Sequence, residues 1–354
     1  MKTDLSRELQ ERVVEAAASG TPLAIVGGGS KSFLGRVASG APLSVAGHRG
    51  IVSYEPRELV LTARAGTPLR EIEAALAERG QMLPFEPPHF GATATLGGTI
   101  ACGLSGPRRP YAGSARDHVL GVRLINGRAE QLRFGGEVMK NVAGYDLSRL
   151  QAGAFGTLGV ILEVSLKVLP RPADEVTLVQ DRDAADSLAY LADLARRPLP
   201  LSAACHDGDR LYLRLSGAAT AVAQSCGQLG GEPLADADAN AFWRDPIKEQ
   251  RHAFFQDGTP LWRLSLPPAS PWLALPGKFL LDWGGAQRWL KTDAPGELIQ
   301  QAAAQANGHA SLFRGAQGGV FQPLPPAMQA LHRRIKHAFD PQNLFNPGRM
   351  IASV

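Results

Sequence analysis

A short apolar run that ends in three consecutive glycines constrains this chain more than any other feature. Residues 22–26 predict a strand, and Gly27-Gly28-Gly29-Ser30-Lys31-Ser32 follows it directly. Consecutive glycines let backbone N–H groups converge on an anion at a place that side chains would block. The spacing excludes the two commonest phosphate loops, because a Rossmann loop requires glycine at position 32 and a Walker loop requires glycine at position 30. We therefore predict an anion-binding turn, with an ordinary tight turn as the alternative.

The length and charge of the chain limit its class. Its 354 residues are enough for two domains, and 44% hydrophobic with 20% charged residues is typical of a globular protein. The net charge of +4 suits an anionic ligand but is too small for a nucleic-acid-binding surface, so no nucleic-acid partner is expected. The sequence has no apolar run of about 20 residues, and its charged N-terminal segment has no apolar signal core. We expect a cytoplasmic protein.

Cysteine usage argues against a disulfide framework or a metal cluster. The three cysteines, Cys102, Cys205 and Cys226, are odd in number and have no C-x-x-C spacing. No metal site is therefore expected, and an iron–sulfur cluster would belong to another chain.

The pattern of helices and strands changes near residue 172. Up to residue 170, helices and strands alternate: a helix over 5–19, strands over 22–26 and 58–64, a helix from Thr67-Pro68 to Gly80, a hairpin over 119–134 and a strand over 160–168. Residues 84–113 are rich in proline and glycine and predict a long functional loop. Later strands are expected over 175–180, 199–205, 210–215, 260–266 and 278–283, with helices over 183–197, 217–229, 295–307 and 327–338.

Four motifs in fixed order resemble the FAD-binding domain of the vanillyl-alcohol oxidase and p-cresol methylhydroxylase superfamily. They are Pro22–Gly35, Leu96–Ala101, Gly113–Gly121 and Gly156–Val160. Met139–Leu147 and Phe345–Arg349 resemble the D-2-hydroxy-acid dehydrogenase branch. Phe134–Asn141, Ala101–Pro110 and Asp282–Gly285 resemble the E-type FAD-binding subunits of bacterial glycolate oxidase.

The resemblance implies an α+β protein with three parts. A two-part FAD-binding domain of the vanillyl-alcohol oxidase type would span residues 1–172. An α+β cap domain built on an antiparallel sheet would span 173–322, and residues 323–354 would form a helix and tail that return to the FAD domain.

Carried over by position, the resemblance also implies the cofactor-binding residues. The diphosphate would lie at the glycine turn, and the ribityl chain and flavin ring along the following segments. The implied residues are Gly27, Gly28, Gly29, Ser30, Lys31, Ser32, Leu96, Gly97, Gly98, Thr99, Ala101, Ser114, Arg116, Gly156, Thr157, Val160 and Asn346. The turn contains no histidine to bond to the flavin, so we expect non-covalent FAD.

Catalytic residues are harder to assign. Oxidation of a 2-hydroxy acid needs a cation for the carboxylate and a base for the hydroxyl proton. Arg108, Arg109, His89 (which Glu86 could pair with) and Arg349 are the candidates, and each has an ordinary structural or surface role as its alternative.

One motif of the branch is absent from this sequence, and its absence affects which subunit is expected to carry out catalysis. Catalytic members of the branch carry a metal-binding segment His-x-Gly-Asp-Gly-Asn-x-His, whereas this chain has only His206-Asp207-Gly208-Asp209-Arg210. The resemblance therefore implies a flavin-bearing partner of a catalytic FAD-binding D-type subunit and an iron–sulfur subunit. Together the subunits would oxidise glycolate, a small 2-hydroxy acid, to glyoxylate. The partners would hold this chain at the inner face of the membrane. A stand-alone FAD-dependent D-2-hydroxy-acid dehydrogenase and a non-catalytic assembly subunit are the alternatives.

Overall fold

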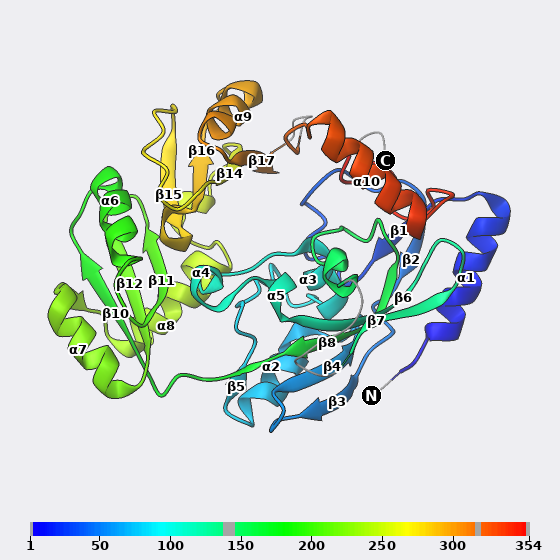
Figure 1. The fold of residues 1–354 in the computed structure, drawn as a ribbon, viewed down its shortest axis with the longest axis horizontal. Coiled ribbons are helices and arrows are strands. Elements are labelled where there is room, and N and C mark those ends of the chain that lie inside the picture. The colour runs from blue at the N-terminus through cyan, green and yellow to red at the C-terminus, as the bar shows by residue number, and fades with distance from the viewer. Residues whose placement is uncertain (1–2, 137–145, 316–319, 352–354) are drawn as a thin grey trace. The chain divides into compact units, whose positions relative to one another are not determined.

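The computed structural model describes residues 3–136, 146–315 and 320–351, which divide into two compact units (Figure 1). The first unit comprises residues 1–104, 114–170 and 323–354, and the second comprises residues 105–113 and 171–322. The segments 134–141 and 139–147, which carry part of the family resemblance, lie largely outside the described residues. None of the described helices is long and apolar enough to cross a membrane.

A five-stranded antiparallel sheet forms the centre of the first unit. Its strand order is β3-β4-β8-β6-β7, with β3 Ile51–Glu55, β4 Val60–Arg64, β8 Val160–Lys167, β6 Val119–Ile125 and β7 Gln131–Gly135. The predicted hairpin and the predicted strand at 160–168 are both present. Strand β8 is buried on both faces, with Val164 and Leu166 in one apolar core and Val160 and Leu162 in another.

The second of these cores joins the two ends of the chain. Helix α1 (Ser6–Ser19) packs Leu9 and Val13 against the short parallel pair β1 (Leu23–Val26) and β2 (Ala41–Ser44). Phe345, which follows helix α10 (Pro326–Phe339), lies in the same core and pairs with Leu23. The C-terminal segment therefore completes a core that the N-terminal segment begins.

The remaining described elements of the first unit include a separate antiparallel pair, β5 (Gln81–Met82) and β9 (Leu169–Pro170). The others are α2 (Leu69–Ala77), α3 (Leu96–Cys102), α5 (Ala115–His118) and η1 (Ser148–Gln151). Thr67, expected to cap α2, accepts a hydrogen bond from the Gly50 N–H, and the helix begins at Leu69. Helix α3 lies inside the segment predicted as a loop, because its two glycines hide the helical signal while Thr95 caps it.

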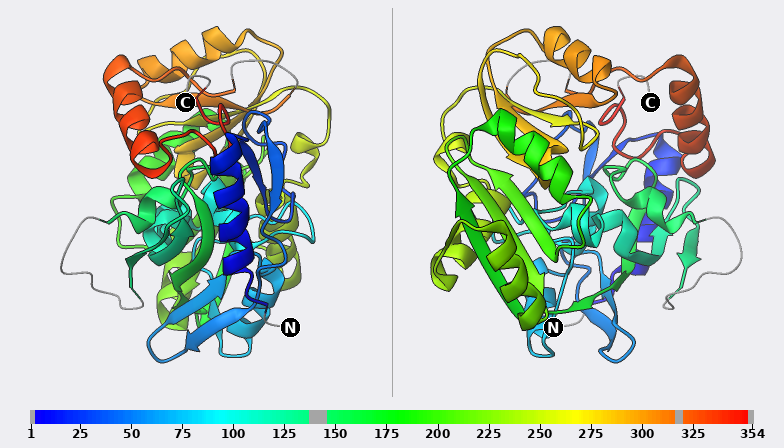
Figure 2. Two further views of the ribbon diagram at one scale, coloured as in Figure 1. Left: turned by 90° about the vertical axis from the view of Figure 1, so that its right-hand side faces the viewer. Right: turned by 60° about the vertical axis from the view of Figure 1, so that its left-hand side comes forward.

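The second unit is an eight-stranded antiparallel sheet with helices on both of its faces (Figure 2). The strand order is β13-β10-β12-β11-β15-β16-β14-β17. The strands are β10 Asp174–Gln180, β11 Leu201–His206, β12 Leu211–Gly217, β13 Glu232–Pro233, β14 Leu261–Ser265, β15 Lys278–Asp282, β16 Gln287–Lys291 and β17 His309–Arg314. The helices are α4 Arg109–Ala112, α6 Ala184–Leu194, α7 Ala219–Leu229, α8 Asp236–Phe242, η2 Trp243–Lys248, η3 Ala253–Phe255, η4 Trp283–Gly285 and α9 Gly296–Gln305. Helices α6, α7 and α9 lie on one face of the sheet. Helix α8 and η2 contact the other face, where Phe242 stacks on Tyr212 and the Trp243 indole N–H donates to Thr177. The α+β fold on antiparallel sheets agrees with the prediction.

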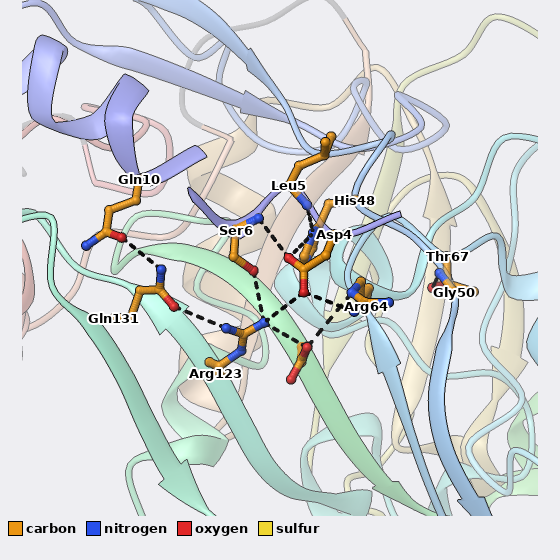
Figure 3. A network of polar contacts seen from close by, with 11 residues as sticks. Asp4, Leu5, Ser6, Gln10, His48, Gly50, Arg64, Thr67, Arg123 and Gln131 are labelled. Atoms are coloured by element: carbon orange, nitrogen blue, oxygen red, sulfur yellow. Dashed lines mark hydrogen bonds and ion pairs between the residues drawn. The ribbon is translucent and has the colours of Figure 1, made fainter. Parts of the chain in front are cut away.

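A polar network anchors the residues that precede α1 (Figure 3). Asp4 accepts a hydrogen bond from the Ser6 N–H at 2.9 Å and one from Arg64 Nη2 at 3.0 Å. The Leu5 N–H donates to Nδ1 of His48 at 2.9 Å, and the His48 side chain is fully buried. Hydrogen bonding to Ser6 holds the pKa of Asp4 well below its usual range, while burial lowers the pKa of His48.

We predict that this anchor weakens as the pH falls below the ordinary histidine pKa of about 6.5. A His48 whose pKa is lowered by folding stabilises the folded state above that pH and loses this contribution as the pH falls. The Asp4 contribution acts in the same direction at lower pH. Hydrogen exchange of the Leu5 amide, corrected for its intrinsic rate, should lose up to about tenfold protection between pH 7 and pH 5.5.

The matched control for this prediction is His48→Asn, because asparagine offers an acceptor but does not titrate. Its Leu5 protection should stay level over the same range. An equal decline in both proteins would assign the effect to another group.

Candidate cofactor-binding site

The glycine turn after β1 borders a cavity of about 120 Å³ in the first unit. Residues from four separate segments of the sequence line it: the turn, helix α3 with its cap, the 155 loop and the C-terminal segment. The lining residues are Ile25, Val26, Gly27, Gly28, Gly29, Ser30, Lys31, Ser32, Thr95, Gly98, Ala101, Cys102, Phe155, Asn346 and Arg349.

Glycine is required at two positions of the turn. A Cβ on Gly28 would overlap the carbonyl oxygen of Thr93, whose own hydroxyl donates to the Gly28 carbonyl at 2.6 Å. Gly29 has a φ of +72°, a conformation that other residues adopt only with strain. The turn is therefore fixed against Thr93 in a shape that only this glycine pattern allows.

The backbone N–H groups of the turn are available to a ligand. Within the described residues, the N–H groups of Gly28, Gly29 and Ser30 donate to no acceptor. Adjacent N–H groups of this kind form an anion-binding concavity, since backbone donors near a protein interior need partners. The turn therefore presents three adjacent backbone donors, and anion binding at the turn stays a prediction.

Two cationic side chains line the same cavity. Lys31 is 6% exposed, and its Nζ lies 3.2 Å from the carbonyl oxygen of His89. Arg349 donates from Nη2 to the Leu34 carbonyl at 3.2 Å, and burial lowers its pKa. Burial also raises the pKa of the Cys102 thiol, against the opposing charges of Lys31 and Arg349. The cavity therefore combines positive charge with a thiol that stays protonated.

The structure brings to the site Thr95, a residue outside the motifs that resemble the FAD-binding domain. Its hydroxyl accepts the Gly98 N–H at 3.3 Å and caps α3. A Cβ on Gly27 would lie 2.6 Å from that hydroxyl, so the turn and the cap are in close contact. A threonine just before Leu-Gly-Gly is an N-cap signal that could have identified it.

Asn346 holds the cavity together from the C-terminal side. Its Oδ1 accepts the Ile25 N–H at 2.8 Å, and its Nδ2 donates to the Phe155 carbonyl at 2.7 Å. Gly156 has a φ of +68°, and a Cβ there would lie 2.8 Å from Asn346 Nδ2. Both ends of the Asn346 amide are thus bonded to the main chain of the cavity wall.

Several predicted cofactor residues lie outside this cavity. Leu96, Thr99 and Val160 are fully buried, and among the described residues the Thr99 hydroxyl has no hydrogen-bond partner. Gly97 packs against β4, where a Cβ would lie 2.6 Å from that of Ala65. These positions support the walls of the site.

Three further predicted residues occupy other places. Ser114 begins α5 in a capping box with Asp117, and Arg116 on the same turn is exposed. Thr157 lines a separate, largely apolar cavity of about 220 Å³, together with Leu158 and other apolar side chains.

The catalytic candidates are distributed over both units. Arg108 and Arg109 belong to the second unit, where Arg108 Nη2 lies 2.6 Å from Glu175 Oε2. His89 Nε2 lies 3.0 Å from Glu73 Oε2 in the first unit. Among the four candidates, only Arg349 lines the cavity at the glycine turn.

The His206 segment is engaged in local hydrogen bonds. Nε2 of His206 lies 2.8 Å from the Arg182 carbonyl oxygen, and Nδ1 accepts the Gly208 N–H at 3.2 Å. No group of three or more potential metal ligands occurs in the part of the chain that the structure describes. His206 thus serves to shape its own turn.

Comparison with known proteins connects this geometry to two families. Residues 5–135 match the FAD binding domain family, and residues 322–350 match the C-terminal domain of FAD linked oxidases. The chain is 50% identical over 351 residues to the glycolate oxidase subunit GlcE of Escherichia coli (strain K12), which covers 99% of each protein. It is 33% identical over 129 residues to the glycolate oxidase subunit GlcD of Bacillus subtilis (strain 168), or 36% of this chain and 27% of that protein.

A solved structure shows the same fold. Alkyldihydroxyacetonephosphate synthase superimposes with a TM-score of 0.67 at 15% identity, covering 96% of this chain and 75% of that one. The predicted fold of the vanillyl-alcohol oxidase type is confirmed.

We predict that Asn346→Ala destabilises the first unit. The change leaves the Ile25 N–H and the Phe155 carbonyl without partners, which costs on the order of 3 kcal/mol. Urea unfolding should show this loss, whereas Gln342→Ala, at an exposed position of the same segment, should stay within about 0.5 kcal/mol of the parent. Equal stabilities of the two variants would show that Asn346 does not hold the cavity wall.

Proposed function

The chain belongs to the GlcE family of FAD-binding glycolate oxidase subunits, and from that premise we propose that it holds the diphosphate of FAD at the turn of Gly27 to Ser32. As a subunit of a glycolate oxidase complex, it takes part in oxidising glycolate to glyoxylate. Electrons pass to a partner subunit or a membrane acceptor.

One observation carries the assignment of the diphosphate. The N–H groups of Gly28, Gly29 and Ser30 have no acceptor within the described chain, and the cations of Lys31 and Arg349 line the same cavity. A diphosphate offers several acceptor oxygens and negative charge, which is the complement of this set. The residues present therefore fit the diphosphate of FAD.

When bound, FAD supplies a ring that accepts a hydride from the substrate carbon. The chain's own contribution is to bind and orient. Lys31 and Arg349 balance the charge of the diphosphate, and Asn346 keeps the wall of the cavity in place. The raised pKa of Cys102 disfavours the thiolate that would attack a flavin, which supports non-covalent FAD.

The partners are inferred from two candidate residues whose side chains are already engaged within this chain. His206 has both ring nitrogens in local hydrogen bonds, and Arg108 is paired with Glu175. We therefore propose that a catalytic FAD-binding D-type subunit supplies the groups that remove the hydroxyl proton, and that an iron–sulfur subunit carries the electrons onward. The same proposal puts the complex in the cytoplasm, at the inner face of the membrane, where its electron acceptor would lie.

The visible spectrum of the purified chain tests this proposal. Bound flavin that is bleached by glycolate under anaerobic conditions only when the D-type and iron–sulfur partners are present supports it. Bleaching of the isolated chain would instead make it a stand-alone dehydrogenase. Absence of a flavin spectrum after reconstitution with FAD would instead favour the alternative that the chain is a non-catalytic assembly subunit.

We predict that Gly28→Ala weakens FAD binding without unfolding the protein. The new Cβ displaces the turn from Thr93 and moves the N–H donors, so FAD affinity should fall at least tenfold. The ratio of flavin absorbance to protein absorbance after reconstitution measures the loss. The control is Gly20→Ala, at a φ of +65° with open space around it, which introduces backbone strain away from the cavity and should keep its FAD. Full FAD content in Gly28→Ala would contradict the assignment.

A further inference from the structure

The guanidinium of Arg263, in the second unit, is only partly used by the protein. Arg263 lies on β14, and its Nε donates to Oε1 of Gln287 at 2.7 Å. Neither Nη1 nor Nη2 has a hydrogen bond or an ion pair within the described residues. Burial and the nearby charge of Arg109 lower the pKa of Arg263 to about 10, against the opposing charge of Asp282, so it stays charged at neutral pH. Arg263 is half-buried, and a charge partly withdrawn from water gains from a directly bonded anion.

A chain of hydrogen bonds fixes the direction of this guanidinium. Gln287, whose oxygen accepts from Arg263, donates from Nε2 to Asp282 Oδ2 at 3.1 Å. Asp282 Oδ1 accepts the Trp283 N–H at 2.7 Å. These residues lie on neighbouring strands or at their ends, so the Nε side of Arg263 is held in place. Its two Nη groups are left to donate to a ligand.

Trp283 forms a rigid surface for the charge. The guanidinium carbon of Arg263 lies 5.1 Å from the centroid of the indole, and that of Arg109 lies 4.2 Å from it. The indole N–H donates to the Gly106 carbonyl at 2.9 Å, which fixes the ring. Two cations thus share one aromatic surface, and no carboxylate lies within ion-pair distance of Arg263 in the described part of the unit.

The arginines of this unit that are buried are committed to the protein. Arg108 is paired with Glu175, and the guanidinium of Arg214 is bonded to Ser202. Arg288 donates to three carbonyl oxygens, those of Ser270, Pro271 and Gly285. These arginines stabilise the fold, whereas Arg263 keeps the paired donors that a carboxylate needs.

We propose that Arg263 binds the carboxylate of a small 2-hydroxy acid through its two Nη groups, with Trp283 as the supporting surface and Arg109 as the second cation. The planar guanidinium matches a carboxylate with two parallel hydrogen bonds. The identity of the acid rests on the proposed function. Arg263 is assigned to binding alone, since a permanently charged guanidinium takes no part in removing the hydroxyl proton.

Calorimetric titration of the FAD-loaded chain with glycolate tests the proposal. Arg263→Gln should weaken glycolate binding roughly 10- to 100-fold, and Arg263→Lys should be intermediate because it keeps the charge without the paired donors. The matched control is Arg251→Gln, which removes an exposed arginine of the same unit and should leave the affinity unchanged. Equal affinity in Arg263→Gln and the parent overturns the proposal.

A second measurement needs no variant. Glycolate should change the tryptophan fluorescence of the parent chain, whereas ethylene glycol, which lacks the carboxylate, should not. Failure of glycolate to bind a chain that retains its flavin absorbance overturns the Arg263 site and leaves the proposed function intact. Loss of flavin absorbance in the parent chain contradicts the proposed function instead.

Discussion

A buried ammonium group joins helix α10 to the loop at residue 157 and to the turn before Asn346, and the candidate cofactor site depends on it. Lys336 Nζ lies 2.6 Å from Asp340 Oδ2 and donates to the carbonyl oxygens of Thr157 and Phe345 at 2.8 and 2.9 Å. Burial lowers the pKa of Lys336, and the ion pair with Asp340 opposes that shift. Asp340 also accepts the N–H groups of residues 344 and 345, so the turn that presents Asn346 is fixed from two sides.

The polar groups of the two units divide into those that hold the protein together and those that the protein leaves to a ligand. Asn346 and Arg108 belong to the first kind, because their donors and acceptors are bonded to the chain itself. The N–H groups of the glycine turn and the Nη groups of Arg263 belong to the second. This difference, more than residue type, decides which positions are available for binding.

Much of this fold could be predicted from local sequence patterns. The apolar run at 160–168 and the Asn126-Gly127 hairpin signal depend only on neighbouring residues, and both elements are present. Strand β16 was missed because Gln287, Arg288 and Lys291 give it no apolar alternation, although the fold buries all three. The same holds for the binding residues. The glycine turn could be predicted because its signal lies in consecutive residues, whereas the role proposed for Arg263 depends on Gln287 and Trp283, which only the folded sheet places beside it.

The bond between Asn346 and Ile25 spans 321 positions of the chain, and this has a consequence for biosynthesis. At roughly 5 to 20 residues per second, a ribosome makes the C-terminal wall of the cavity about 15 to 60 s after the glycine turn. During that interval the nascent chain displays a strand and turn whose core partner Phe345 does not yet exist. The cavity that we propose for the flavin is therefore completed late in synthesis, only once residues 346–349 have been made, and until then the apolar partners of Phe345 are available to chaperones or proteases.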